Sequence, residues 1–566
     1  MKAQYPNRTA LTYAAWCAAA LVLTACGGGG GHGSSSDPDP ISGTHLTFEA
    51  TPASAEADLV ELNIVSFTPA NGKADVEIDA VFEAAFSETV TETSLNQYSF
   101  YLTGPEGVVP GDIALSADGL SARFTPEQAL SHDSTYTATL TTAIENSTAP
   151  TRTLAREYST HFQTQDIWTK MLGTENQDLG MDIAHDHEGN LYILGLTRGS
   201  IDEQTLPGAL DSFITKFDSE GNKVWTRQWG TSDAGITFAS AIAIDNTNHI
   251  YVTGGTAGAF PGQINQGSSD YFVSKLDSEG NILWSKQYGS AEGDYANGIT
   301  LDGEGNIYLI GETSGTLDSQ TNAGFVDIFI SKLDTQGALQ WTKQWGTNGY
   351  DYGRSIALNA SGTHLYATGA TPGDLDGNGE HENNGEVDIY ILQITVSGIE
   401  GWIRQWGSRE YDESNHLTLD IDGNIYITGT THGELDGHPN AGQSDNFLAK
   451  FNPYGEKLWI QQWGSASWDN GIGLTTHKET GELYVASVTI NGPADTDISL
   501  SKFDSNGFLQ WIQETKMNGI GSTTGISIDN NHIYMTGFTQ TDVDGYVNQG
   551  EQDVYIFKYS NKGYKK

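Results

Sequence analysis

Short runs in which apolar and polar residues alternate follow one another after residue 60. Three of them are residues 80–86, 98–102 and 135–140. A period of two is typical of strands that bury one face. Turn formers such as Asn71-Gly72 and Asp118-Gly119 separate these runs. About a hundred residues with this spacing predict a single β-sandwich over residues 62–165.

From residue 166 onward the chain repeats itself. Each unit holds a tryptophan, a tyrosine 23 to 26 residues later, and then an aspartate. The tryptophans recur at intervals of 52 to 61 residues: Trp168, Trp225, Trp284, Trp341, Trp402, Trp459 and Trp511. The aspartates are Asp211, Asp270, Asp327, Asp388, Asp445, Asp497 and Asp553. Self-similarity at such a period indicates a repeat architecture.

One unit shows that each repeat should form four strands. Residues 296–301, 307–311, 327–333 and 339–345 are strand-length runs separated by turn formers. The middle runs are apolar on both faces, which is expected where each sheet packs between two neighbouring sheets. The last unit lacks a fourth strand, whereas residues 166–173 form a fourth strand with no unit before it. We therefore predict a seven-bladed β-propeller that closes by pairing this early strand with the last blade.

The first segment resembles a known family of domains. Its motifs are the run from Phe67 to Gly72, Phe124-Thr125-Pro126 and the closing Phe162-Gln163-Thr164. These residues are similar to the bacterial Ig-like domain of the SbsA type, although Ala149-Pro150-Thr151 replaces the usual glycine near the last hairpin. The resemblance implies a spacer or an adhesive module.

The repeats also resemble a known family. Trp284-Ser285-Lys286-Gln287-Tyr288-Gly289 and the run from Asp327 to Asp334 look like the SBBP (β-propeller repeat) family of bacterial surface and secreted proteins. Units six and seven depart from it, since Val485-Ala486-Ser487 lacks the glycine and residues 513–516 lack the amide-aromatic-glycine trio. The resemblance implies a fold and no single activity. The predicted fold class is all-β: an N-terminal Ig-like β-sandwich, then a seven-bladed β-propeller over residues 166–566.

The first 26 residues indicate the compartment. Lys2 and Arg8 precede an apolar stretch over residues 10–25 that is too short to span a bilayer, which predicts a secretory signal peptide over residues 1–25. The stretch ends in Leu23-Thr24-Ala25-Cys26, which resembles the lipobox of bacterial lipoproteins. The resemblance implies cleavage before Cys26 and acyl chains on Cys26. A chance cleavage site beside a stray thiol is the alternative.

The residues after Cys26 indicate in which membrane the protein is expected to be anchored. Gly27 stands where, by family resemblance, an aspartate favours retention in the inner membrane, so we expect an outer-membrane lipoprotein of the cell envelope, periplasmic or surface exposed. Residues 26–61 are rich in Gly, Ser and Pro and predict a flexible tether. The only other cysteine, Cys17, lies in the signal peptide, so no disulfide is expected in the mature chain.

The net charge of the chain limits the classes of molecule that it is expected to bind. The chain has 72 acidic and 27 basic residues and a formal net charge of -45. A nucleic-acid reader needs clustered Lys and Arg, so we exclude that class. We expect a monomer that touches the membrane through its lipid anchor and binds an unknown protein or glycan.

Candidate chemistry lies in the loops between the second and third predicted strands. The densest loop offers five oxygen-bearing side chains: Asp374, Asp376, Asn378, Glu380 and Asp388. Carboxylate and carboxamide oxygens on a glycine-rich backbone suit Ca²⁺, which we predict here. The loop opens like a calcium loop, but Gly385 occupies the position of its acidic twelfth ligand. The alternative is that these residues are turn formers that cap their own backbone. For the seven strand-initial aspartates we favour that architectural role.

Motifs of catalysis are missing from the sequence: it has no HExxH, GxSxG, P-loop or CxxC. We therefore expect a lipid-anchored envelope binding or scaffold protein that presents its propeller and performs no catalysis. The alternatives are a hydrolase or lyase that acts on polysaccharide and a purely structural envelope component. An enzyme should bring His, Arg, Tyr and carboxylates together at one mouth of the propeller channel, whereas a binder should expose an aromatic or apolar patch.

Overall fold

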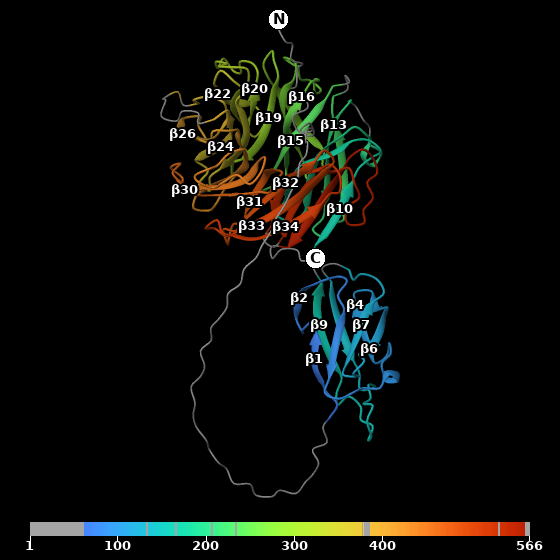
Figure 1. Ribbon diagram of the computed structural model, residues 1–566. Helices are drawn as coiled ribbons and strands as arrows, with labels where there is room; N and C mark the ends of the chain where they lie inside the picture. The colour runs from blue at the N-terminus through green and yellow to red at the C-terminus, as the bar shows by residue number, and fades with distance from the viewer. Residues whose placement is uncertain are drawn as a thin grey trace, which may run out of the picture. The chain divides into compact units, whose positions relative to one another are not determined.

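The computed structural model describes residues 61–131, 134–164, 167–204, 208–231, 235–375, 377, 385–529 and 532–560 (Figure 1). These residues form two compact units, residues 61–164 and 167–560. Within the described ranges no helix is long and apolar enough to cross a membrane. The predicted signal peptide, most of the tether and Cys26 lie outside the described residues, as do Asp376, Asn378 and Glu380.

The first unit is a sandwich of two sheets. Their strand orders are β1-β3-β7-β6 and β2-β9-β8-β4-β5. Alternate residues of β3 and β8 point into a shared core, where the rings of Phe82 and Phe162 stack at 4.8 Å. The elements are β1 (Ile64–Thr68), β2 (Lys73–Val76), β3 (Phe82–Phe86), the 3₁₀ turn η1 (Glu92–Ser94), β4 (Phe100–Gly104), β5 (Gly107–Val109), β6 (Gly111–Leu115), β7 (Ser121–Pro126), β8 (Thr135–Leu140) and β9 (Tyr158–Thr164).

The second unit contains seven four-stranded antiparallel sheets, each of which is one blade of a ring. The first strands, which lie nearest the axis, are β11 (Asp178–His185), β15 (Thr237–Ile244), β19 (Asp294–Leu301), β23 (Tyr352–Leu358), β27 (Asp412–Leu419), β31 (Trp468–Thr476) and β35 (Gly521–Ile528). The second strands are β12 (Leu191–Thr197), β16 (Ile250–Thr256), β20 (Ile307–Thr313), β24 (His364–Thr371), β28 (Ile425–Thr431), β32 (Leu483–Gly492) and β36 (His532–Thr539).

The outer half of each blade completes the sheet. The third strands are β13 (Asp211–Phe217), β17 (Asp270–Leu276), β21 (Asp327–Leu333), β25 (Asp388–Thr395), β29 (Asp445–Phe451), β33 (Asp495–Phe503) and β37 (Asp553–Ser560). The fourth strands are β14 (Lys223–Trp229), β18 (Ile282–Tyr288), β22 (Leu339–Trp345), β26 (Glu400–Trp406), β30 (Lys457–Trp463), β34 (Leu509–Lys516) and β10 (Trp168–Leu172). The short turn η2 (Ile201–Glu203) lies between β12 and β13.

The ring closes through β10. This strand pairs antiparallel with β37, from Trp168 opposite Lys558 to Leu172 opposite Val554. The inner strand β11 packs against both β15 and β35, and Thr524 Oγ1 donates a hydrogen bond to the Gly180 carbonyl at 2.8 Å. The prediction that the early strand completes the last blade is therefore confirmed, and so is the all-β class.

The repeated tyrosine of the sequence anchors each inner hairpin. Tyr308, buried on β20, donates a hydrogen bond from its hydroxyl to Asp302 in the preceding turn at 3.0 Å. The Lys332 ammonium lies 5.2 Å from the centre of the same ring. Five other blades repeat the bond with an acidic residue in the same turn: Tyr192 with Asp186, Tyr251 with Asp245, Tyr426 with Asp420, Tyr484 with Glu482 and Tyr534 with Asp529.

Blade 6 departs from the repeat pattern for a visible reason. Its second and third strands, β32 and β33, are longer than those of the other blades and are joined by a hairpin of two residues. Blade 6 therefore lacks the long loop between its second and third strands. The glutamine side chain that forms hydrogen bonds to this loop in blades 1 to 5 would have no such loop to contact here. Asp497 is instead paired with Lys516 at 3.5 Å.

Candidate functional site

The first and third strands of every blade begin at the same face of the ring. In blade 3, Asp294 at the start of β19 and Asp327 at the start of β21 both pair with Thr313 at the end of β20. The loops between second and third strands lie at this end of each blade, and so do the connections between blades. We call it the loop face.

A charged cluster lies near the axis on the loop face. Arg354 of β23 donates a hydrogen bond from Nε to Glu413 Oε1 at 2.7 Å, and its Nη1 lies 3.8 Å from Glu312 Oε2. The guanidinium also lies 4.7 Å from the centre of the Tyr352 ring. Arg354 reaches both carboxylates because it is the extra residue of a β-bulge between Gly353 and Ser355. Burial raises the pKa of Glu312 above its usual range.

Aromatic side chains extend from this cluster along the loop face. The Tyr411 hydroxyl donates a hydrogen bond to Glu413 Oε2 at 2.7 Å. The His432 ring lies 5.3 Å from the Tyr411 ring and 5.3 Å from the Trp468 ring. Burial lowers the pKa of His432 below its usual range. The contacts join blades 5 and 6.

A second aromatic contact lies on blades 3 and 4. Phe325 and Tyr350 stack at 5.2 Å with an interplanar angle of 19°. They are 64% and 51% exposed, unlike the partly buried residues of the cluster. We call Phe325, Tyr350, Tyr411, His432 and Trp468 the aromatic arc. An exposed aromatic pair of this kind suits the binding of another molecule.

The sequence contained a signal for the arc that sequence reasoning missed. Tyr350, Tyr411 and Trp468 each stand one residue before the aspartate at or near the start of a first strand. Each forms a parallel bridge with the residue before a third-strand aspartate, namely Val326, Val387 and Ser444. Three consecutive blades therefore present an aromatic residue at the same structural position.

An enzyme was expected to bring His, Arg, Tyr and carboxylates together at the channel mouth, and a binder to expose an aromatic patch. The structure meets the second criterion better than the first. Arg, Tyr and carboxylates do converge near the axis, but the described contacts of Arg354 go to Glu413, Glu312 and Tyr352. The guanidinium is therefore already occupied within the protein. The exposed pair Phe325 and Tyr350 meets the criterion for a binding patch.

The described residues of the predicted calcium loop form hydrogen bonds within their own turn or blade. Asp374 Oδ1 accepts a hydrogen bond from the Gly377 amide at 3.0 Å. Asp388 is buried at the start of β25, where it accepts a bond from Gln405 Nε2 at 3.4 Å. Asp436, which holds the place of Asp376 in the next blade, is ion-paired with Lys457 at 2.5 Å. Calcium in this loop stays a prediction.

The strand-initial aspartates hold the loops in place. In blade 5, Asp445 Oδ2 accepts hydrogen bonds from the Ala441 amide and from Gln462 Nε2, both at 3.0 Å. Gln462 also donates to the Gly433 carbonyl and accepts from the Leu435 amide, both at 3.0 Å. Blades 1 to 4 repeat the glutamine contacts with Gln228, Gln287, Gln344 and Gln405. Among the described residues no group of three His, Cys, Asp or Glu side chains could hold a metal ion.

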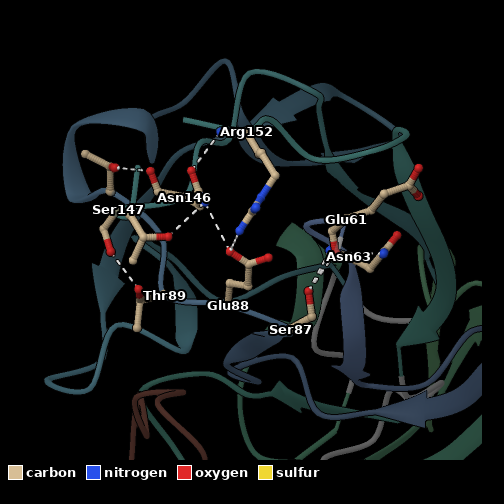
Figure 2. A network of polar contacts seen from close by, with 10 residues as sticks. Glu61, Asn63, Ser87, Glu88, Thr89, Asn146, Ser147 and Arg152 are labelled. Carbon is tan, nitrogen blue, oxygen red and sulfur yellow. Dashed lines mark hydrogen bonds and ion pairs between the residues drawn. The ribbon is translucent and has the colours of Figure 1, made fainter. Parts of the chain in front are cut away.

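The Ig-like sandwich carries a polar network beside a surface depression. Glu88 is ion-paired with Arg152 and accepts a hydrogen bond from Asn146 Nδ2 at 3.1 Å, and Thr89 Oγ1 lies 2.6 Å from Ser147 Oγ (Figure 2). The hydrogen bond from Arg152 lowers the pKa of Glu88. These contacts tie two loops together. The neighbouring depression has a volume of about 460 Å³ and is lined by Thr89, Ser116, Asp118 and Ser147 among others.

Comparison with known families agrees with this architecture. Residues 58–164 match the model of the bacterial Ig-like domain, and residues 283–317 and 401–436 match that of the beta-propeller repeat. The chain combines a bacterial Ig-like domain with beta-propeller repeats. The two propeller matches fall in the units that hold Trp284 and Trp402, at the centre of the ring's sequence.

Individual relatives are distant. An uncharacterized WD repeat-containing protein of Acanthamoeba polyphaga mimivirus is 21% identical over 533 residues, which cover 70% of this chain and 38% of that protein. Regulatory protein FlaEY of Caulobacter vibrioides is 23% identical over 322 residues, which cover 50% and 33%. The chain thus spans about a third of the length of the curated relatives it matches. Kuenenia stuttgartiensis hydrazine synthase is a similar solved structure, with 15% identity and a TM-score of 0.40 over 64% of this chain and 93% of that chain.

Proposed function

We propose that this chain is a cell-envelope binding or scaffold protein that presents the loop face of its propeller to a protein partner and performs no catalysis. The observation that carries the proposal is the aromatic arc, whose stacked pair Phe325 and Tyr350 is exposed on the loop face. WD-repeat and regulatory proteins among the relatives support a protein-interaction scaffold. A glycan is the alternative ligand, since aromatic rings also stack on sugars.

Photo-crosslinking in cells tests the proposed binding face. We expect benzoylphenylalanine at position 350 to capture a partner protein, because Tyr350 is exposed within the arc. Tyr454 offers a matched control: it is 74% exposed, and it lies in the turn after β29, at the opposite end of blade 5. Equal capture from positions 350 and 454, or capture from 454 alone, would contradict the proposal. A Tyr350→Ala, Phe325→Ala variant should lower the affinity for the captured partner roughly 10-fold or more, as for aromatic hot spots.

We propose that a lipid on Cys26 anchors the chain to the outer membrane. The lipobox-like Leu23-Thr24-Ala25-Cys26 and the following Gly27 support this location. Two acyl signals are needed for stable anchoring, so the acylated chain should fractionate with membranes. Labelling with a palmitate analogue should mark the wild-type chain and leave Cys26→Ser unmarked and soluble. Membrane association of Cys26→Ser at the wild-type level would rule out the anchor.

We also propose that calcium binds the loop from Asp374 to Asp388. The support for this proposal is the set of oxygen-bearing side chains in the loop. Titration calorimetry with calcium, with Asp374→Asn as the comparison, tests it. If no heat of binding is measured at millimolar calcium, the proposal of a calcium site is wrong.

A further inference from the structure

Pairs of buried aspartates meet at five of the seven junctions between blades. One aspartate of each pair begins a third strand, and the other lies at the start of the first strand of the next blade. The pairs are Asp270 with Asp294, Asp327 with Asp351, Asp388 with Asp412, Asp445 with Asp469, and Asp553 with Asp178. Ten carboxyl groups out of contact with water require an explanation.

The two carboxyl groups of a pair point at the same place. A Cβ on Gly289 would lie 2.4 Å from Asp270 Oδ1 and 2.9 Å from Asp294 Oδ2. Gly464 stands in the same relation to Asp445 Oδ1, at 2.3 Å, and to Asp469 Oδ2, at 3.0 Å. The glycine of the Gln-aromatic-Gly motif therefore leaves room for two facing carboxyl groups.

Hydrogen-bond donors are distributed unevenly within the pair of Asp270 and Asp294. Both oxygens of Asp294 accept bonds, from the Ser290 amide and hydroxyl and from the Thr313 hydroxyl. Asp270 Oδ2 accepts bonds from the Gln266 amide at 2.9 Å and from Gln287 Nε2 at 3.0 Å. Asp270 Oδ1 is buried and has no hydrogen-bond donor among the described residues. The third-strand aspartates Asp327, Asp445 and Asp553 leave the same oxygen without a donor.

The junction between blades 1 and 2 provides an internal comparison. Thr237 there replaces the second aspartate, and Asp211 is the third-strand member. The Gly208 amide donates to Asp211 Oδ1 at 3.0 Å, and Gln228 Nε2 donates to Oδ2 at 3.1 Å. Pro207, four residues before Asp211, has no N–H, whereas at paired junctions the amide four residues before the third-strand aspartate donates to Oδ2, as Ala323 does to Asp327 and Ala441 to Asp445. In the pair of Asp270 and Asp294, the oxygen without a donor lies on the side of Gly289 that the second carboxylate also lines.

We propose that two of these pairs, Asp270 with Asp294 and Asp553 with Asp178, each share one proton, carried on the donor-free oxygen of the third-strand aspartate and donated to the aspartate of the neighbouring blade, so that these two junctions tighten at mildly acidic pH. Above that range the proton leaves to solvent, and two buried carboxylates repel each other across the junction. Two of the junctions between blades respond to pH in this way.

The surroundings of the pairs agree with a shared proton. Burial, and to a smaller extent the facing carboxylate, raises the pKa of Asp294 and Asp553 to about 6. Around Asp294 the packed residues Gln287, Ser290 and Thr313 are uncharged. Tyr271 stays protonated, since burial raises its pKa.

A cation at the same place fits less well. The oxygens of Asp294 are already bonded to N–H and O–H donors, which a metal ion would have to displace. Two carboxylates are also fewer than the six to eight oxygens that Ca²⁺ takes.

The sign of the effect follows from the raised pKa. A carboxyl group whose folded pKa lies above its unfolded value stabilises the fold at low pH and loses that contribution as pH rises through about 6. Burial lowers the pKa of His185 and His416, and such groups act in the opposite direction between pH 4 and 6.5. The measurement is therefore the difference between a variant and the wild type at each pH, in which the histidines cancel.

The test uses the full chain with Asp270→Asn and Asp553→Asn combined, and Asp270→Asn alone as a milder variant. The asparagine amide supplies permanently the hydrogen that the proton supplies at low pH. We expect melting temperatures equal to the wild type at pH 5 and higher by about 2–4 °C at pH 8. The control Asp211→Asn should melt lower at both pH values, because either amide orientation deprives one donor of its acceptor.

A second readout does not depend on stability. Infrared spectra of the wild type at pH 5 should show a protonated carboxyl band that the double variant reduces. The proposal is overturned if Asp270→Asn and the double variant melt at or below the wild type at pH 8, or if the band is unchanged. It is also overturned if millimolar calcium raises the wild-type melting temperature at pH 8 and the variants abolish that rise, since a cation would then occupy the junction.

Discussion

A chain that begins at residue 174, and so lacks β10, is expected to melt at least about 10 °C below the full chain and to aggregate. Without β10, the edge of β37 is unpaired, although seven of its eight residues are buried in the closed ring. Tyr555 and Phe557 would then lie in an open edge strand. Calorimetry and light scattering measure the two effects.

A chain that begins at residue 167 is the control. It lacks the Ig-like sandwich but keeps β10, and residues 167–560 form a compact unit by themselves. We expect its propeller transition to match that of the full chain within about 2 °C, because no strand of the ring is lost. Equal stability of the chains beginning at 167 and at 174 would mean that β10 does not close the ring.

Gly311→Ala is expected to destabilise the propeller by about 3 kcal/mol or more. A Cβ at this position on β20 would lie 2.0 Å from the Tyr295 carbonyl oxygen and 2.8 Å from Ala296 Cα. Both atoms belong to the backbone of the bulged strand β19, so no side-chain rotation removes the clash. Urea unfolding followed by tryptophan fluorescence measures the loss as a lower midpoint.

Gly303→Ala is the matched control for that variant. Gly303 lies in the turn that joins β19 to β20, and a Cβ there would have no atom within 4 Å. We expect its free energy of unfolding to stay within about 0.5 kcal/mol of the wild type. If the two alanine variants lose equal stability, the close approach of β20 to β19 is not the cause.

Most of the fold could be predicted from the sequence because it depends on local patterns. A strand such as β20 or β21 is apolar on both faces since neighbouring blades cover both, and that pattern is visible in the chain. The missing fourth strand of the last repeat and the surplus strand at Trp168 likewise predicted the pairing of β10 with β37. A repeat that cannot bury its faces alone implies its neighbours.

Less of the candidate site than of the fold could be predicted from the sequence. Arg354, Glu312 and Glu413 come from three blades and are separated by 42 and 59 residues, so no local motif relates them. The calcium loop attracted attention because its residues are adjacent in sequence, whereas the described members Asp374 and Asp388 bond within their own turn and blade. Their turn-forming role was one of the two interpretations that composition allowed.

The sequence by itself determined the strands, the repeat and the closure of the ring, because each depends on the spacing of apolar residues and turn formers along one stretch of chain. Only the tertiary structure decided which polar groups meet between blades. Arg354 lies between two carboxylates, Phe325 stacks on Tyr350, and Asp270 faces Asp294 across Gly289. These contacts depend on blade packing and on the bulge that redirects each first strand, and a one-dimensional pattern does not encode such distances.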